Sequence, residues 1–135
     1  MQGGVFSLGD FTITTAAVYV GDPVTDLDGM LAATVQLRFD YVSGGIAVRA
    51  YTQTSLDQGT TWIDIACVLF GTAAERAVLN FSKLTPQTTQ IVPTDGALPD
   101  DTTHDGILGD RLRLKLVSSG IYSGSTVLSA RVAVS

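Results

Sequence analysis

The sequence contains very few residues of the kinds that form covalent links or metal centres. It has one cysteine, Cys67, and one histidine, His104, in 135 residues. A single cysteine excludes an intramolecular disulfide, and this pair excludes zinc sites of the usual Cys/His kinds. Cys67 stands in an apolar run at residues 65–69. Because free cysteine is usually buried, we expect a small core residue there rather than a nucleophile.

Charged side chains are also scarce, and acidic ones dominate. Asp, Glu, Lys and Arg make up 16% of the chain, and the net charge is −5. This balance argues against nucleic acid or an anionic membrane surface as the main partner, because both are themselves negatively charged. We interpret the acidity as an aid to solubility. The low total charge indicates that much of the surface is either shared with a partner or merely polar.

Several motifs and long runs are missing. No apolar run is long enough to span a bilayer, and no basic stretch followed by an apolar run marks a signal peptide. We therefore expect synthesis in the cytoplasm and no membrane partner. Glycine motifs of the P-loop or dinucleotide-binding type are absent, and we expect no cofactor. The length suits one domain with its own core.

The chain shows a β pattern along its whole length and no amphipathic helix. The clearest strand is at residues 111–116, where leucines alternate with cations and give one apolar and one polar face. Residues 34–41 alternate in the same way, with Val35, Leu37, Phe39 and Tyr41 expected to point inward. Residues 61–70 are apolar on nearly all sides, which is typical of a central strand or of one whose outer face meets a partner.

Turns rich in Gly, Asp and Ser separate these runs and predict about eight strands. The expected fold is all-β, a single antiparallel β-sandwich of jelly-roll type, with an immunoglobulin-like arrangement as the rival. We expect the sandwich to occupy residues 11–135. The glycine-containing start, residues 1–10, is expected to be an N-terminal arm that can reach a neighbour.

The run Ser-Leu-Asp-Gln-Gly-Thr-Thr-Trp matches every fixed position of the S-x-D-x-G-x-T-W pattern known as the Asp-box. Its fixed residues here are Ser55, Asp57, Gly59, Thr61 and Trp62. The serine and aspartate side chains can accept hydrogen bonds from backbone N–H groups, and the glycine supplies backbone freedom. The tryptophan begins the next strand and can cover the turn. The pattern therefore predicts a hairpin corner, and it predicts structure rather than catalysis.

The longest irregular segment, residues 93–106, contains four aspartates. Carboxylate oxygens suit calcium, but the spacing does not match an EF-hand. We favour a solvated surface loop and leave calcium binding open. A loop of this length can also contact a neighbouring subunit, for which Asp100, Asp101 and His104 are the candidate side chains.

No set of residues predicts catalysis, and we expect no enzyme. Asp57 and Asp64 would have to supply the two carboxylates of a glycoside hydrolase, yet the turn already uses Asp57. A triad built on His104 lacks the G-x-S-x-G elbow that exposes a serine. Sialidase propellers carry several Asp-boxes, and a propeller needs about four blades of four strands, more than this chain can supply.

An exposed aromatic side chain is the usual means of stacking a sugar. Tyr122, which stands among serines and glycines, is the best exposed candidate for such a contact. The competing interpretation, which we prefer, is a tyrosine that packs over a hairpin turn.

Two segments together resemble a known family. Residues 51–66 contain the Asp-box followed by Ile-Asp-Ile-Ala, and residues 108–128 contain Gly-Asp-Arg-Leu-Arg. This pairing is similar to small all-β virion proteins of tailed phages and of phage-like gene transfer agents. The family commonly has glycine where this chain has Gln58, a position that faces outward in the turn. The first half of the chain agrees with the family only in its strand pattern.

The resemblance implies a non-enzymatic structural component of a phage or phage-like particle, such as a head decoration, head spike, fibre base or tail accessory protein. Such a protein would be made in the host cytoplasm and be located in the virion. Its partners would be copies of itself, as a homo-oligomer, and other virion proteins. The alternative is a carbohydrate-binding module that recognises a host-surface glycan. A glycosidase relative is a third hypothesis.

Overall fold

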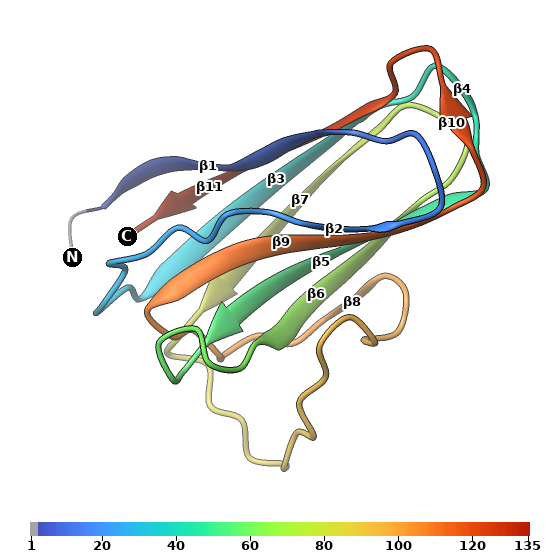
Figure 1. Cartoon of the computed structure of the whole chain (residues 1–135). Helices are drawn as coiled ribbons and strands as arrows, with labels where there is room; N and C mark the ends of the chain where they lie inside the picture. The colour runs from blue at the N-terminus through green and yellow to red at the C-terminus, as the bar shows by residue number, and fades with distance from the viewer. Residues whose placement is uncertain (1–2) are drawn as a thin grey trace.

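The computed structural model describes residues 3–135 and consists of strands joined by turns and loops (Figure 1). The strands within these residues are β1 (Gly4–Thr12), β2 (Val18–Val20), β3 (Ala32–Asp40), β4 (Ser43–Gly44), β5 (Ala47–Ser55), β6 (Ile63–Phe70), β7 (Glu75–Ser82), β8 (Thr102–Thr103), β9 (Arg111–Ser119), β10 (Tyr122–Ser123) and β11 (Val127–Val134). Over the same residues there is no helix with the length and apolar character needed to cross a bilayer. The predicted all-β fold class is confirmed.

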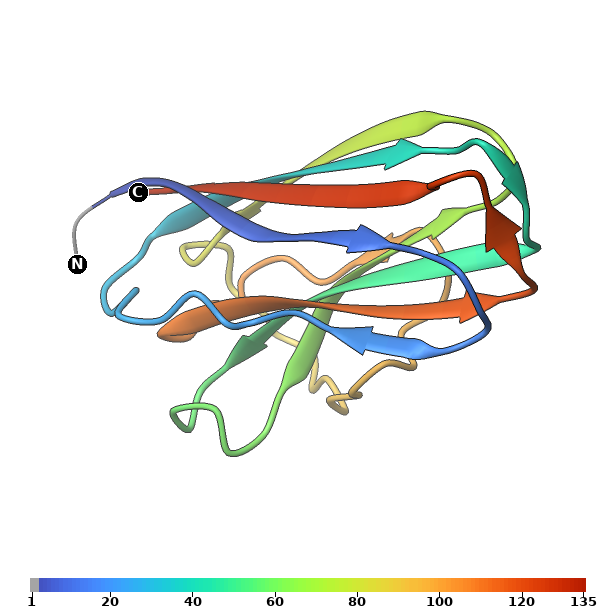
Figure 2. The same cartoon turned by 45° about the horizontal axis from the view of Figure 1, so that its top comes forward.

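Two antiparallel sheets form the layers of the sandwich (Figure 2). Sheet A has the strand order β1-β11-β3-β7, and sheet B has the order β2-β9-β5-β6-β8. The short strands β4 and β10 pair with each other at one end of the sandwich. Every pairing between these strands is antiparallel.

The strand order is that of a jelly roll. When the eight strands of three or more residues are numbered along the chain, sheet A reads 1-8-3-6 and sheet B reads 2-7-4-5. The chain therefore changes sheets at each connection between these strands except the β5–β6 hairpin, as two Greek keys require. This order excludes the immunoglobulin-like arrangement. The remaining three strands are two residues long, so the described residues form eleven strands where about eight were expected, and eight of them build the jelly roll.

The core lies between the two sheets and follows the period-two alternation of the strands. Val35, Leu37 and Phe39 of β3 are buried, as predicted, whereas Tyr41 follows the end of β3 and is only partly buried against the core. On sheet B the leucines of β9 face the same core, while the cations between them lie on the outer face. Phe39 stacks on Phe70 with ring centroids 5.2 Å apart, which joins the two layers near the β4–β10 end.

The prediction of an N-terminal arm over residues 1–10 is wrong for the part of it that the structure describes as β1. This strand pairs along its length with β11 and passes through a bulge between Ser7 and Gly9. Leu8 is buried in the core and Phe6 packs against it. Burial of these apolar side chains outweighs the freedom of the nearby glycines, so the sandwich begins at residue 4. Residues 1 and 2 lie outside the described residues.

The segment between β7 and β9, residues 83–110, crosses the outer face of sheet B, and we call it the covering segment (Figure 1). Its short strand β8 pairs with β6, and Leu98 is buried against Tyr51 and Cys67. Strands β5 and β6 are therefore covered on both faces. This explains why the run at residues 61–70 is apolar on nearly all sides: β6 is a central strand, and its outer face meets a segment of its own chain.

Leu114 provides a test of the assigned core, since it lies at the middle of β9 and is fully buried. We expect Leu114→Ala to lower the free energy of unfolding by about 2–5 kcal/mol, because it removes apolar contacts and leaves a cavity. Val78→Ala truncates an exposed side chain of β7 and should change the free energy of unfolding by less than about 0.5 kcal/mol. Urea unfolding measures both, and equal midpoints for the two variants would contradict this core.

Candidate functional site

The turn between β5 and β6 is closed by the side chains of Ser55 and Asp57. The Ser55 hydroxyl accepts the N–H of Gly59 at 2.8 Å and donates to the Asp57 carboxylate at 2.9 Å. The same carboxylate accepts the hydroxyl and the backbone N–H of Thr61, which together hold the pKa of Asp57 below its ordinary value. Gly59 has a φ of 88°, a conformation that suits glycine. These contacts are the turn chemistry expected from the sequence.

The two segments that carry the resemblance lie against each other at this corner. The N–H of Gly109 donates to the Thr54 hydroxyl at 2.9 Å, and the N–H of Asp110 donates to the Ser55 carbonyl at 3.3 Å. A Cβ atom at position 109 would overlap the carbonyl oxygen of Ser55, so this close approach requires glycine. The turn and the start of β9 therefore form one packed unit.

Trp62 lies partly exposed on the outer face of sheet B, beyond the turn. The guanidinium carbon of Arg113 is 4.2 Å from the centroid of its ring, a cation–π contact. Burial lowers the pKa of Arg113 from its ordinary value, although the Asp95 carboxylate opposes this shift. The tryptophan therefore joins β6 to β9, and Arg113 lies over its ring.

Asp64 is a buried polar residue of β6 to which the covering segment is hydrogen-bonded. Strict alternation from Ala66 would place Asp64 on the core face, but a bulge between β5 and β6 adds Ile65 to the strand. Ile65 fills the core position instead, and Asp64 points outward opposite Gln53. A one-residue insertion thus moves a carboxylate from the apolar core to a polar contact.

The Asp64 carboxylate accepts hydrogen bonds from five groups in two parts of the chain. It accepts the Gln53 amide at 2.8 Å and the Thr94 hydroxyl at 2.9 Å. It also accepts the backbone N–H groups of Gly96, Ala97 and Leu98, the shortest at 2.8 Å. Because a buried carboxylate is stable only when its lone pairs are satisfied, this contact fixes the path of residues 94–98 over the sheet.

A second layer of charges surrounds this carboxylate. Gln53 accepts from Arg113 at 2.7 Å and donates to Asp95 at 2.6 Å, so its amide joins β9 to the covering segment. Lys115 pairs with Asp95 at 3.0 Å. Burial raises the pKa of Asp95, but the hydrogen bonds from Gln53 and Lys115 outweigh it and leave the pKa below its ordinary value. The network therefore holds the covering segment against β5 and β9.

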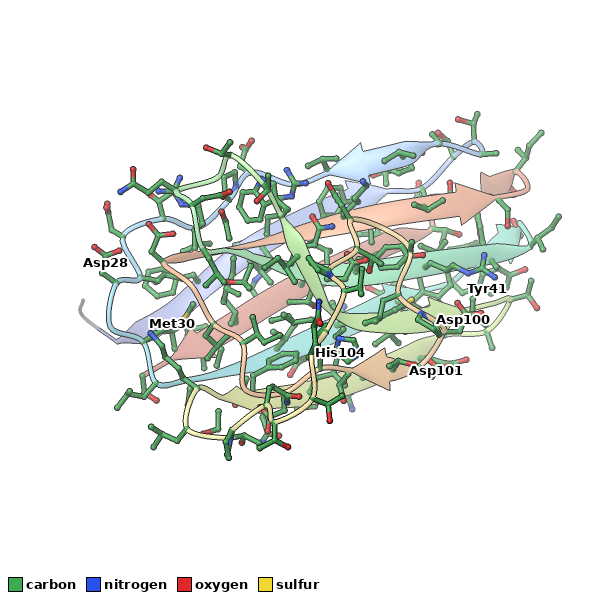
Figure 3. The ribbon with its side chains drawn as sticks, turned by 90° about the horizontal axis from the view of Figure 1, so that it is seen from below. Asp28, Met30, Tyr41, Asp100, Asp101 and His104 are labelled. Carbon is green, nitrogen blue, oxygen red and sulfur yellow. The ribbon has the colours of Figure 1, made fainter. Side chains whose placement is uncertain are left out.

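The candidate contact residues of the acidic loop lie along this covering segment (Figure 3). Asp100 pairs with Arg49 at 2.7 Å, and Asp101 accepts the N–H of Leu69 at 3.1 Å. The backbone N–H of His104 donates to the carbonyl of Ile65 at 2.8 Å. These contacts attach the loop to β5 and β6 of its own chain. Among residues 3–135 no group of three or more His, Cys, Asp or Glu side chains could hold a metal ion.

The structure contradicts an exposed Tyr122. Its side chain is 2% exposed and its hydroxyl donates to the carbonyl of Gly71 at 2.9 Å. The ring packs edge-on against Phe39 and Tyr41, and burial raises the pKa of its hydroxyl. The preferred interpretation, a tyrosine that packs over a turn, is confirmed, and Tyr122 offers no sugar-stacking face.

Cys67 is buried as expected, at 1% exposure, on the outer side of sheet B beneath the covering segment. Burial raises the pKa of its thiol to about 11, with the Asp100 charge as the next cause. A thiol of that pKa stays protonated at neutral pH and is a poor nucleophile. Its position beside Tyr51 and Leu98 makes it part of the contact between loop and sheet.

Sequence reasoning missed two features. The first is the role of Asp64, although a lone acid inside an apolar strand was the available signal. The second is a group of exposed apolar side chains at the β4–β10 end, namely Val42, Ile46 and Ile121. The sequence feature that could have revealed this group is the absence of charged residues from 41–48 and 116–130.

Comparison of the chain with protein-family models, with curated proteins and with solved structures finds no match. The resemblance of residues 51–66 and 108–128 to virion proteins therefore stays a prediction from the sequence.

Removing the Asp64 carboxylate should release the covering segment. We expect Asp64→Ala to lower the free energy of unfolding by about 3 kcal/mol or more, because it removes the acceptor of one Gln53 N–H, of the Thr94 hydroxyl and of three backbone N–H groups. Asp101→Ala, which removes one acceptor at an exposed position, should cost about 1 kcal/mol or less. Urea unfolding gives both values. Limited proteolysis should cut Asp64→Ala near residues 94–98. A variant that resists cleavage and keeps the wild-type urea midpoint would contradict the role of Asp64 in holding this segment.

Asp105 should make stability depend on pH. Its carboxylate accepts the N–H of Ser82 at 2.7 Å and the Thr85 hydroxyl at 2.9 Å, and these donors lower its pKa from 3.8. A carboxyl with a lowered folded-state pKa stabilises the fold above its unfolded value, and this contribution is lost as pH falls through the folded value. Below about pH 4 the free energy of unfolding should therefore fall, and Asp105→Asn should reduce that fall. Urea unfolding at several pH values measures how steeply the free energy of unfolding falls, with Asp22→Asn as the charge control. If Asp105→Asn gave the same slope as wild type, the role of Asp105 would be contradicted.

Proposed function

We propose that this protein is a non-enzymatic structural component of a phage or phage-like particle, as a head decoration, head spike, fibre base or tail accessory protein. It would act through self-assembly and through contacts with other virion proteins, and would be located in the virion after synthesis in the host cytoplasm. The observation that carries the proposal is the packing of residues 51–66 against the start of residues 108–128. The two segments that resemble virion proteins form one corner of one jelly roll.

The use of the polar side chains supports a structural role. Asp57 is engaged by Thr61 within its turn, and Asp64 by the covering segment. Asp100 is paired with Arg49, and Asp101 with the backbone of β6. Each carboxylate considered for chemistry or for ligand binding thus has a defined contact within the fold.

The jelly roll itself is consistent with two of the hypotheses. This architecture occurs in viral capsid domains and in lectins, so likeness of fold alone does not separate a particle subunit from a glycan binder. The aromatic side chains favour the subunit: Tyr122 is buried, and Arg113 lies over the ring of Trp62. A glycan-array signal that is lost in Trp62→Ala, with folding retained, would favour the carbohydrate-binding alternative.

Particle association is the direct test. Particles from the source of the sequence are purified by density-gradient centrifugation and probed with an antibody raised against the chain. We expect the chain to sediment with the capsid protein and to remain with it after nuclease treatment and a second gradient. A chain that stays in the soluble fractions at the top of the gradient would overturn the proposed location. Immunogold labelling of positive fractions then distinguishes the head from the tail.

A further inference from the structure

One end of the sandwich carries no charge in its four connecting loops. These loops join β1 to β2, β3 to β5, β6 to β7 and β9 to β11, and they lie at the end opposite the C-terminus (Figure 1). They comprise residues 13–17, 41–46, 71–74 and 120–126, which contain no Asp, Glu, Lys or Arg. We call this surface the uncharged end.

Large apolar side chains are exposed on the uncharged end. Val42, Ile46 and Ile121 are 54%, 68% and 72% exposed. They belong to two loops that are hydrogen-bonded to each other, since the N–H of Gly45 donates to the carbonyl of Ile121 at 2.7 Å. Leu31, Leu56 and Leu84 are also exposed near the acidic end, so exposure alone does not select the contact surface. At the uncharged end, exposed apolar side chains on adjoining loops coincide with an absence of charge, which lowers the cost of covering them.

The loops of the uncharged end are fixed in place. Strands β4 and β10 pair across them, and the hydroxyls of Ser43 and Ser123 are 2.7 Å apart. Tyr41 donates to the carbonyl of Gly44 at 3.0 Å, while the buried Tyr122 ties β10 to the β6–β7 loop. A surface held by such contacts loses little conformational entropy when a partner covers it.

The distribution of charge favours a second copy as that partner. The segments at the opposite end, residues 21–31, 56–62, 83–85 and 104–110, contain six aspartates and one lysine, and Asp28 and Tyr41 mark the two ends in Figure 3. Near the uncharged end the charges of the strands balance: Arg38 pairs with Asp40 at 3.1 Å, Arg49 pairs with Asp100 at 2.7 Å, and Glu75 and Arg76 at the start of β7 have opposite signs. The six aspartates at the far end are Asp22, Asp26, Asp28, Asp57, Asp105 and Asp110.

Two copies of a chain with a net charge of −5 repel each other, and the repulsion is least when their acidic ends point apart. A contact through the uncharged ends meets this condition. A two-fold contact also matches each apolar patch with an identical one, as self-complementary interfaces require. A charged partner would find no opposite charge in these loops and would lose hydration without compensation.

We propose that the uncharged end is the self-association surface of this protein and is covered by a second copy in a two-fold contact centred on Val42, Ile46 and Ile121. The inference rests on the proposed function, because a particle subunit of this kind acts through copies of itself.

The test measures the mass of the full chain in solution against concentration, by sedimentation equilibrium. Wild type should rise from 14.1 kDa toward twice that mass. The double variant Ile46→Asp with Ile121→Asp places like charges in the contact and should weaken dimerisation at least about tenfold. Leu84→Asp is the matched control, since its side chain is 74% exposed and lies outside the uncharged end. The control should dimerise like wild type.

Salt and a milder variant complete the test. About 0.5 M NaCl screens the repulsion between acidic copies and should leave dimerisation unchanged or stronger. If the aspartate variant fails to fold, Ile121→Ser replaces it and should weaken the dimer in the same direction. The inference is overturned by a wild type that stays monomeric at millimolar concentration, by dissociation in salt, or by equal weakening in Leu84→Asp.

These outcomes are separable from those of the proposed function. A chain found in purified particles but monomeric in solution would leave the particle role standing and remove the self-contact. A chain that dimerises through Ile46 and Ile121 but never sediments with particles would support the self-contact and overturn the particle role.

Discussion

The buried carboxylate of Asp64 fixes the outer layer of this protein. It accepts three successive backbone N–H groups from residues 96–98, and the Gln53 amide brings Arg113 and Asp95 into the same network. Without this contact residues 96–98 would lose their hydrogen bonds to the sheet, although Asp100, Asp101 and β8 anchor the segment further along. The outer surfaces of Tyr51 and Cys67 would then be exposed to water. The carboxylate therefore allows a sheet to be apolar on both faces in a single short chain.

The same contact explains how the surface is divided. The covering segment brings most of its aspartates into contact with the sheet or with β7, where Arg49, Lys115 and backbone N–H groups receive them. Charges lie on the outer faces of both sheets and at the end near residues 21–31 and 56–62. The loops around β4 and β10 carry none. A molecule with one acidic end and one uncharged end has a preferred direction for contact, which is the basis of the self-association proposed above.

Local patterns predicted the parts of the structure that local physics controls. Alternation placed Val35, Leu37 and Phe39 in the core, and the side chains of Ser55 and Asp57 were correctly assigned to a turn. The arm at residues 1–10 was predicted wrongly, because glycines near the terminus were weighted above the alternation of Phe6 and Leu8. The serines and glycines around Tyr122 favour an exposed contact residue, yet it packs on Phe39, a residue 83 positions away. No pattern within its own loop could reveal that neighbour.

The sequence by itself determined the strands, the corner at residues 55–62 and the all-β class, because period-two burial and turn chemistry act between residues close in the chain. Tertiary structure alone decided the jelly-roll order, the outward turn of Asp64 at its bulge and the gathering of four uncharged loops at one end. Each of these depends on which distant strands pair. Pairing is decided by how the whole apolar surface is buried at once, so a one-residue shift at Ile65 can redirect a carboxylate that the linear pattern assigns to the core.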